Sequence, residues 1–126
     1  MKYLLDTHVV LWLLMGERDA LGPGVVEEIG SPRSTPYVSA ASVWEIAIKR
    51  SLGKVVLEDR WLNALLSLEL EHLPVTAHHA AAVEDLPWHH RDPFDRLLVA
   101  QAVVEGCTLV TSDAALTAYG IPILWG

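Results

Sequence analysis

Short apolar runs of four or five residues alternate along the chain with longer segments that have helical periodicity or are apolar throughout. The short runs predict β-strands at residues 2–6, 36–39, 72–75, 108–111 and 121–124. The longer segments predict helices at residues 7–15, 25–29, 40–52, 61–70, 76–83, 93–105 and 113–119. Because short apolar strands alternate with helices, the pattern predicts an α/β fold, a parallel sheet with helices on both faces.

Capping residues and prolines indicate where some of these elements begin and end. The clearest helix follows Asp92, a good cap, has Pro93 at its first position and ends before Gly106. Thr7 is a candidate cap for the first helix. Pro74 interrupts the third strand, which predicts that this strand lies at an edge of the sheet.

The composition is that of a folded protein. Of the 126 residues, 52% are hydrophobic and 20% are charged, which excludes intrinsic disorder, and we expect residues 1–126 to form a single domain. The single cysteine, Cys107, cannot form an internal disulfide, which favours a reducing cytoplasm. No apolar run reaches the ~20 residues that span a bilayer, and Asp6 lies too near the amino terminus for a signal peptide. The sequence therefore predicts a cytoplasmic protein with no membrane contact.

The net charge narrows the choice of partners. It is −7, so the chain lacks the broad positive charge that drives non-specific binding to nucleic acid. This argues against a DNA-binding module. It argues less against an enzyme, because acidic residues gathered around a cation reverse the local electrostatics.

Several acidic residues are predicted to meet at one edge of the sheet. Asp6 ends the first strand, Glu45 lies early in the helix after the second strand, and Asp113 directly follows the fourth strand. Asp92 and Asp95 lie at the start of the clearest helix. Ligands of parallel sheets bind at the carboxyl ends of the strands. Carboxylates collected there raise one another's pKa unless a cation is present, and oxygen ligands in an open cleft suit Mg²⁺ or Mn²⁺.

Each of these acidic residues also has a purely structural interpretation. A carboxylate at a helix N-terminus is stabilised by ~0.3–1 kcal/mol through the helix dipole. Asp92 is explained as a cap, and Ser42 with Glu45 fits a capping box. The histidines offer no HExxH motif and no Cys/His zinc spacing.

Four stretches of the sequence resemble a known family. They are LLDTHVVLWLL, VSAASVWEIAIKRSLGKV, HRDPFDRLLVAQA and TLVTSDAAL…YGIPILW, and they cover nearly the whole chain in order. Together they resemble the PIN domain and, more narrowly, the VapC-type toxins of bacterial toxin–antitoxin pairs. The resemblance implies a three-layer α/β/α fold whose five-stranded parallel sheet has the order 3-2-1-4-5. In that order Asp6 and Asp113 follow adjacent strands.

The resemblance also implies the site residues. The family's first acid, at the end of the first strand, corresponds to Asp6, and its second, on the helix after the second strand, to Glu45. Its third precedes an apolar helical run, which selects Asp95 over Asp92. Its fourth, after the TLVT strand, corresponds to Asp113. These four are the expected catalytic and metal-binding residues.

An activity and its partners follow from the same resemblance. It implies an endoribonuclease in which Mg²⁺ (or Mn²⁺) polarises the scissile phosphate of RNA and lowers the pKa of an attacking water, so that no protein nucleophile is needed. It also implies inhibition by a small antitoxin, and a homodimer. An apolar surplus supports such contacts, and the following tryptophans are interpreted as core or interface residues: Trp12, Trp44, Trp61 and Trp88.

Hydroxyl and basic residues are candidates for supporting roles. Thr7, Thr111 and Ser112 can hold cation-bound waters or phosphate oxygens, or serve only as caps and turn formers. The basic residues are interpreted as a phosphate-facing rim or as solvated helix faces: Lys49, Arg50, Lys54, Arg91 and Arg96. Arg96 is counted among the supporting site residues.

Three other function classes are compared with this prediction. A phosphoacceptor receiver domain needs adjacent acids at the first strand and an Asp after the third, but the first strand offers only Asp6 and the third ends Pro74-Val75-Thr76. An aspartyl phosphatase of the DxDx(T/V) type is excluded because position 8 is His. The alternative that stays open is a catalytically silent PIN-fold binding module. The complete acidic quartet argues against it, and a Mg²⁺-dependent cleavage assay would separate the two.

Overall fold

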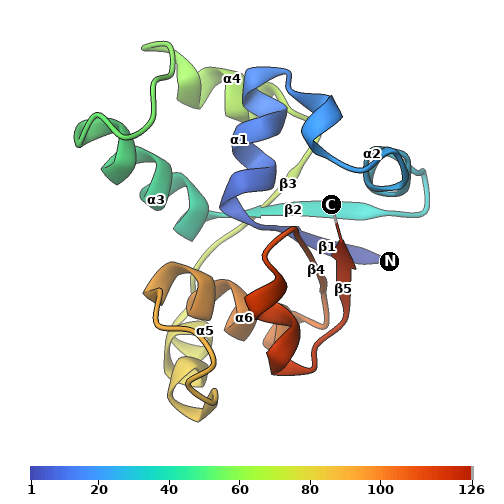
Figure 1. Cartoon of the computed structure of the whole chain (residues 1–126), viewed down its shortest axis with the longest axis vertical. Helices are drawn as coiled ribbons and strands as arrows, with labels where there is room; N and C mark the ends of the chain where they lie inside the picture. The colour runs from blue at the N-terminus through green and yellow to red at the C-terminus, as the bar shows by residue number, and fades with distance from the viewer. Residues whose placement is uncertain (126) are drawn as a thin grey trace.

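The computed structural model describes residues 1–125, which contain a five-stranded sheet (Figure 1). Its strands are β1 (Lys2–Leu5), β2 (Thr35–Ser39), β3 (Glu71–Leu73), β4 (Thr108–Thr111) and β5 (Ile123–Trp125). Neighbouring strands are parallel, and the order across the sheet is β3-β2-β1-β4-β5. The α/β class expected from the sequence pattern and the strand order implied by the family resemblance are therefore confirmed.

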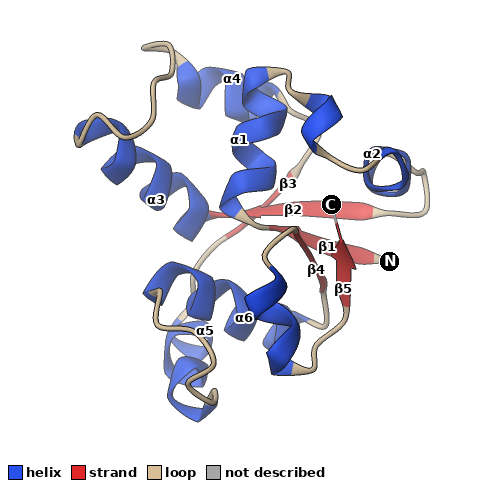
Figure 2. Ribbon diagram, viewed as in Figure 1, coloured by secondary structure: helices blue, strands red, loops and turns tan. Residues whose placement is uncertain are grey.

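Helices cover both faces of the sheet, so that the molecule has three layers (Figures 1 and 2). One side carries α1 (Thr7–Met15), α2 (Pro23–Ile29), α3 (Ala40–Ser51) and α4 (Trp61–Ser67). The other side carries α5 (Ala77–Ala82) and α6 (Pro93–Glu105). Short 3₁₀ helices connect these elements: η1 (Arg18–Ala20), η2 (Val83–Asp85) and η3 (Ala114–Tyr119). Within residues 1–125, no helix is both long and apolar enough to cross a bilayer.

The two faces of the sheet have separate hydrophobic cores. Tyr3 and Leu5 of β1 join Val110 of β4 in the core beneath α1, α2 and α4. Leu4 and Leu109 point the other way and pack with α6 and η3. Because side chains alternate along a strand, the two central strands need apolar residues on both faces, and these strands are therefore apolar without interruption.

The α6 helix has the boundaries that its sequence predicts. The Oδ1 atom of Asp92 accepts the backbone N–H groups of Phe94 at 2.8 Å and of Asp95 at 3.3 Å. At the other end Gly106 adopts the left-handed conformation, with φ of 68°, which favours glycine. Both boundaries are therefore confirmed, as is the edge position of β3.

Two of the predicted caps are wrong. The cap of α1 is Asp6, not Thr7, because Asp6 has the extended backbone of a cap and accepts a backbone N–H of the first turn at 2.9 Å. The cap of α3 is Ser39, whose hydroxyl accepts a backbone N–H of that helix at 3.0 Å. The capping box predicted at residues 42–45 therefore does not form, and these residues lie inside the helix.

Several other predicted elements differ in extent or type. The fourth helix ends at Ser67 rather than at residue 70, because Leu68 is extended and the chain turns toward β3. Leu70 packs against the core from this extended segment, so the apolar pattern continues past the end of the helix. The segment predicted as a helix at 113–119 is the 3₁₀ helix η3, and the last strand begins at Ile123 rather than at residue 121.

Candidate active site

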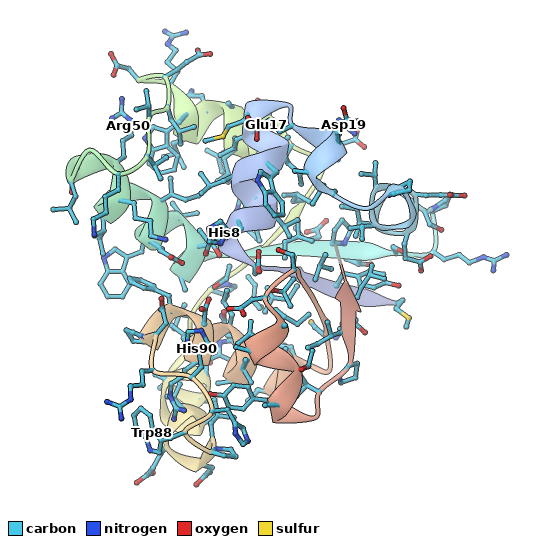
Figure 3. All side chains as sticks on the ribbon, in the orientation of Figure 1. His8, Glu17, Asp19, Arg50, Trp88 and His90 are labelled. Atoms are coloured by element: carbon cyan, nitrogen blue, oxygen red, sulfur yellow. The ribbon has the colours of Figure 1, made fainter. Side chains whose placement is uncertain are left out.

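Three acidic residues meet where β1 and β4 end. These strands are neighbours in the sheet, and Asp6 directly follows β1 while Asp113 lies just beyond β4. Asp95 comes from the first turn of α6. They share a cavity of about 310 Å³, which we call the acidic cleft, lined by Asp6, His8, Trp12, Asp95, Ser112 and Asp113. His8 reaches this end of the sheet from α1, and His90 reaches it from the loop ahead of α6 (Figure 3).

Asp6 is the most deeply buried of these three acids, with 5% of its surface exposed. Its Oδ1 accepts the N–H of Val9, and its Oδ2 accepts the hydroxyl of Thr111. Burial raises the pKa of Asp6, and the two hydrogen bonds oppose that rise. The carboxyl group is therefore held in one orientation, in a place where its negative charge is unfavourable.

Thr111 links Asp6 to Asp113. The Thr111 side chain is fully buried, and while its hydroxyl donates to Asp6 it accepts the N–H of Asp113 at 3.0 Å. Asp113 also caps η3, because its Oδ1 accepts the N–H of Ala115 at 2.9 Å. The Thr111 hydroxyl therefore forms hydrogen bonds within the protein and fixes Asp6 and Asp113 relative to each other.

Asp95 has the most perturbed surroundings in the cleft. The pKa of Asp95 is raised to about 7, chiefly by burial and also by the charges of Asp92, Glu45 and Asp6. The nearby His90 opposes the rise. A carboxyl group whose pKa is raised by burial and by neighbouring carboxylates is one that a bound cation would ionise.

Glu45 does not line this cavity and is engaged by partners of its own. It is buried in α3, and its Oε1 accepts the Thr7 hydroxyl at 2.6 Å while its Oε2 lies 2.7 Å from Nζ of Lys49. The hydrogen bond to Glu45 raises the pKa of Lys49. The sequence left Lys49 open as part of a phosphate-facing rim or of a solvated helix face, and in the structure it is the counter-ion of Glu45.

His90 is a site residue that sequence reasoning missed. Its Nε2 lies 3.3 Å from Oδ2 of Asp95 and 3.4 Å from Oδ2 of Asp113. It belongs to no zinc-binding motif of the sequence, and its position depends on how the loop ahead of α6 folds back. The only sequence signal is its place two residues before the Asp92 cap.

The donor set of the cleft suits a divalent cation. One ligand atom each from His90, Asp95 and Asp113 lie within 4.8 Å of one another. Asp6 lines the same cavity, and burial, with smaller increases from neighbouring carboxylates, raises the pKa values of Asp6 and Asp95. Carboxylate oxygens of this kind match Mg²⁺ or Mn²⁺.

Arg96 does not face the cleft, which corrects its interpretation as a supporting, phosphate-facing residue. Its surface is only 2% exposed. Its guanidinium donates to the Tyr119 hydroxyl and to three backbone carbonyls, those of Val83, Leu86 and Pro87. With these donors engaged, the group is not available to a phosphate. Of the other basic residues, Arg50 pairs with Asp59, whereas Lys54 and Arg91 are exposed.

Trp12, Trp44, Trp61 and Trp88 divide into two groups. Trp12 and Trp61 pack against the core beneath α1, as expected for core residues. Trp44 and Trp88 are 60% and 76% exposed, so they are not core residues. Trp44 contacts Phe94 edge to face, with ring centroids 5.1 Å apart.

Comparisons with known proteins bear on the family and on the fold. The sequence model of the PIN domain family matches residues 3–121. The fold is similar to that of a chain in the crystal structure of VapBC2 from Rickettsia felis bound to a DNA fragment from their promoter, with a TM-score of 0.74, 19% identity and coverage of 98% of this chain and 97% of that one. A chain of the DNA-bound VapBC from Salmonella typhimurium has a TM-score of 0.71 and 18% identity, with coverage of 98% of this chain and 97% of that one. A chain of VapBC-1 from nontypeable Haemophilus influenzae has a TM-score of 0.68 and 18% identity, with coverage of 100% of this chain and 97% of that one. No curated protein sequence matches the chain.

Proposed function

Because the chain belongs to the PIN domain family, we propose that it is an endoribonuclease that needs a divalent cation, Mg²⁺ or Mn²⁺, and that it is the toxin of a toxin–antitoxin pair. The observation that carries the nuclease proposal is the acidic cleft, where Asp6, Asp95 and Asp113 line one cavity and the pKa of Asp95 is raised to about 7. Carboxylates crowded in this way favour a bound cation, which relieves their repulsion.

The side chains around the cleft have distinct roles in this proposal. Asp95 and Asp113, together with Asp6, would hold the cation, and a bound cation would supply Lewis-acid polarisation of a phosphoryl oxygen and activation of water. Thr111 fixes the carboxyl groups of Asp6 and Asp113 relative to each other. Glu45 is oriented by Thr7 and Lys49, and its negative charge acts on Asp95. The orientation of these groups is therefore set before RNA binds.

The proposed partner is a small cognate antitoxin. The structures from Rickettsia felis and Salmonella typhimurium are of VapBC complexes bound to DNA, and we extend that type of partner to this chain. An apolar groove of about 380 Å³ offers a place for it, lined by Ala40, Val43, Leu62, Leu66, His72, Leu73 and Pro74. A homodimer and a cytoplasmic location belong to the same proposal.

The nuclease proposal is tested with purified chain separated from any partner. We expect it to cleave RNA with Mg²⁺ or Mn²⁺ and to lose that activity when EDTA is added, because the oxygen ligands of the cleft act through the cation. Robust cleavage in EDTA would contradict the cation mechanism. Intact RNA, together with cation binding and a normal melting temperature, would favour the catalytically silent binding module instead.

A further inference from the structure

The imidazole of His90 faces two carboxylates that come from different elements. Its Nε2 lies almost equally far from Oδ2 of Asp95, on α6, and Oδ2 of Asp113, beyond β4, at 3.3 and 3.4 Å. His90 itself belongs to the loop ahead of α6 (Figure 3). Such a nitrogen has two alternative roles: it binds the cation directly, or it carries a proton that it shares with the carboxylates.

The other ring nitrogen distinguishes these roles. Nδ1 of His90 accepts the backbone N–H of Asp92 at 3.0 Å, so Nδ1 carries no proton. A neutral imidazole has one N–H, which must then be on Nε2. A histidine that binds a metal ion through Nε2 has the opposite arrangement, with Nδ1–H donating to an acceptor. The contact with Asp92 therefore favours a donor over a ligand.

The loop is built in a way that keeps the ring in this place. The backbone N–H of His90 donates to the Tyr119 hydroxyl at 3.1 Å, and the same hydroxyl accepts from Arg96 at 3.2 Å. The buried Arg96 guanidinium also holds the Pro87 carbonyl at 2.8 Å. Trp88 covers that guanidinium, with its ring centroid 3.8 Å from the central carbon. The chain on the N-terminal side of His90 is therefore fixed by contacts that do not involve the cleft.

We propose that His90 is a positioning residue of the acidic cleft, whose Nε2–H contacts the Asp95 and Asp113 carboxylates and orients them, so that the cation is bound by oxygen atoms alone. This inference rests on the proposed function, since it assumes a bound cation. Residues that orient metal ligands in this way contribute strongly to metal affinity, and their loss typically costs 10–100-fold. The loop contacts of Arg96 and Tyr119 serve the cleft through His90.

The proton position is read directly by long-range ¹H–¹⁵N NMR of the imidazole nitrogens. We expect the Nε2–H form of His90 in the metal-free protein and again after loading with Mg²⁺. Loss of the Nε2 proton on addition of Mg²⁺ would overturn the proposal, because it would make Nε2 a ligand. A Nδ1–H form in the metal-free protein would overturn it as well. The metal-free spectrum tests His90 even if the chain fails to bind cations or cleave RNA, which would contradict only the proposed function.

Variants supply a second readout in cation binding. We expect His90→Ala to weaken Mg²⁺ and Mn²⁺ binding by a similar factor, on the order of ten-fold. His90→Gln should restore most of the affinity, because its amide N–H can reach the same carboxylates. The matched control is His78→Ala, an exposed histidine of α5, which should change neither affinity. A selective loss of Mn²⁺ binding in His90→Ala, or a directly coordinated ¹⁴N signal from His90 in pulsed EPR of the Mn²⁺ form, would overturn the proposal.

Discussion

The surroundings of Asp95 show how a single residue reports on the whole cleft. Its side chain is 23% exposed, and burial raises its pKa more than any one neighbouring charge does. The charges of Asp92, Glu45 and Asp6 add to the effect. Without a cation, the folded protein therefore keeps a proton that an unfolded chain would release.

This gives a prediction for stability against pH in the absence of metal. The pKa of Asp95 is 3.8 ordinarily and about 7 in the folded protein. Between these values the folded state binds more protons than the unfolded state, so the free energy of unfolding falls as pH rises from about 4 to about 7. Asp6, whose pKa is also raised, acts in the same direction. Urea denaturation in EDTA at pH 4.5, 6 and 8 measures the fall.

Asp95→Asn should make that pH profile flatter and should be more stable than the wild type at pH 8, because it removes a charge that the fold disfavours. Asp19→Asn, at an exposed position of η1, is the matched control and should leave the profile unchanged. An Asp95→Asn variant that is less stable than the wild type at pH 8 would show that the ionised carboxylate stabilises the fold.

Local rules anticipate some of these residues and not others. Asp92 could be recognised as a cap because the signal lies entirely in the adjacent Pro93 and the helical run. The position of Asp6 at the end of a strand follows from the same kind of local pattern. His90 and Arg96 could not be assigned, since their contacts involve Tyr119, more than twenty residues away. Hydrogen bonds of that range depend on the folded chain.

At the scale of elements, the connection between η2 and α6 is organised by one buried guanidinium. Arg96 lies in the first turn of α6 and donates to the carbonyls of Val83, Leu86 and Pro87, which lie in η2 or just after it. It also donates to Tyr119 at the end of η3. One side chain thus joins three elements around the loop that carries His90.

Arg96→Lys should therefore destabilise the protein although it keeps the positive charge. A lysine ammonium has three donors and no planar fork, so it cannot satisfy the four acceptors that surround the guanidinium. We expect a loss of about 2–3 kcal/mol in the free energy of unfolding, measured by urea denaturation. Arg91→Lys, at an exposed position of the same loop, should stay within about 0.5 kcal/mol of the wild type. Equal stability of the two variants would contradict the role given to Arg96.

The elements themselves were predictable where an apolar period coincided with a cap or a breaker. α6 is the clearest case, with Asp92 and Gly106 at its ends. The end of α4 was not predictable, because Leu68 and Leu70 continue the apolar pattern while the backbone has already become extended. Burial alone does not distinguish a helical residue from an extended one that reaches the same core.

At the scale of the whole molecule, the alternation of strands and helices predicts a parallel sheet but not the order of its strands. The order 3-2-1-4-5 came from the family resemblance, and it is what makes β1 and β4 neighbours. That adjacency brings Asp6 and Asp113, far apart in sequence, to a single cavity.

Exposed apolar residues are a second feature of the whole molecule. A contiguous exposed apolar surface marks a site where a partner binds.

The groove between α3, α4 and β3 gives a prediction about that partner. Leu66 lines the groove and is 57% exposed. Leu66→Lys should leave the melting temperature unchanged and weaken binding of the cognate antitoxin at least ten-fold, because a charge would be buried on association. Val103→Lys, at an exposed position of α6 outside the groove, serves as the control. Calorimetry in which Leu66→Lys binds like the wild type would place the antitoxin elsewhere.

The most direct test of the central claim compares two acids three residues apart in metal-dependent RNA cleavage. Asp92 Oδ1 caps α6, and asparagine caps about equally well, so Asp92→Asn should cost about 0.5 kcal/mol and still cleave RNA in Mn²⁺. Asp95 lines the acidic cleft, so Asp95→Asn should fold normally and lose cleavage. Turnover and melting temperature are measured for both variants. An inactive Asp92→Asn beside an Asp95→Asn variant that cleaves normally would contradict the assignment of the cleft as the catalytic site.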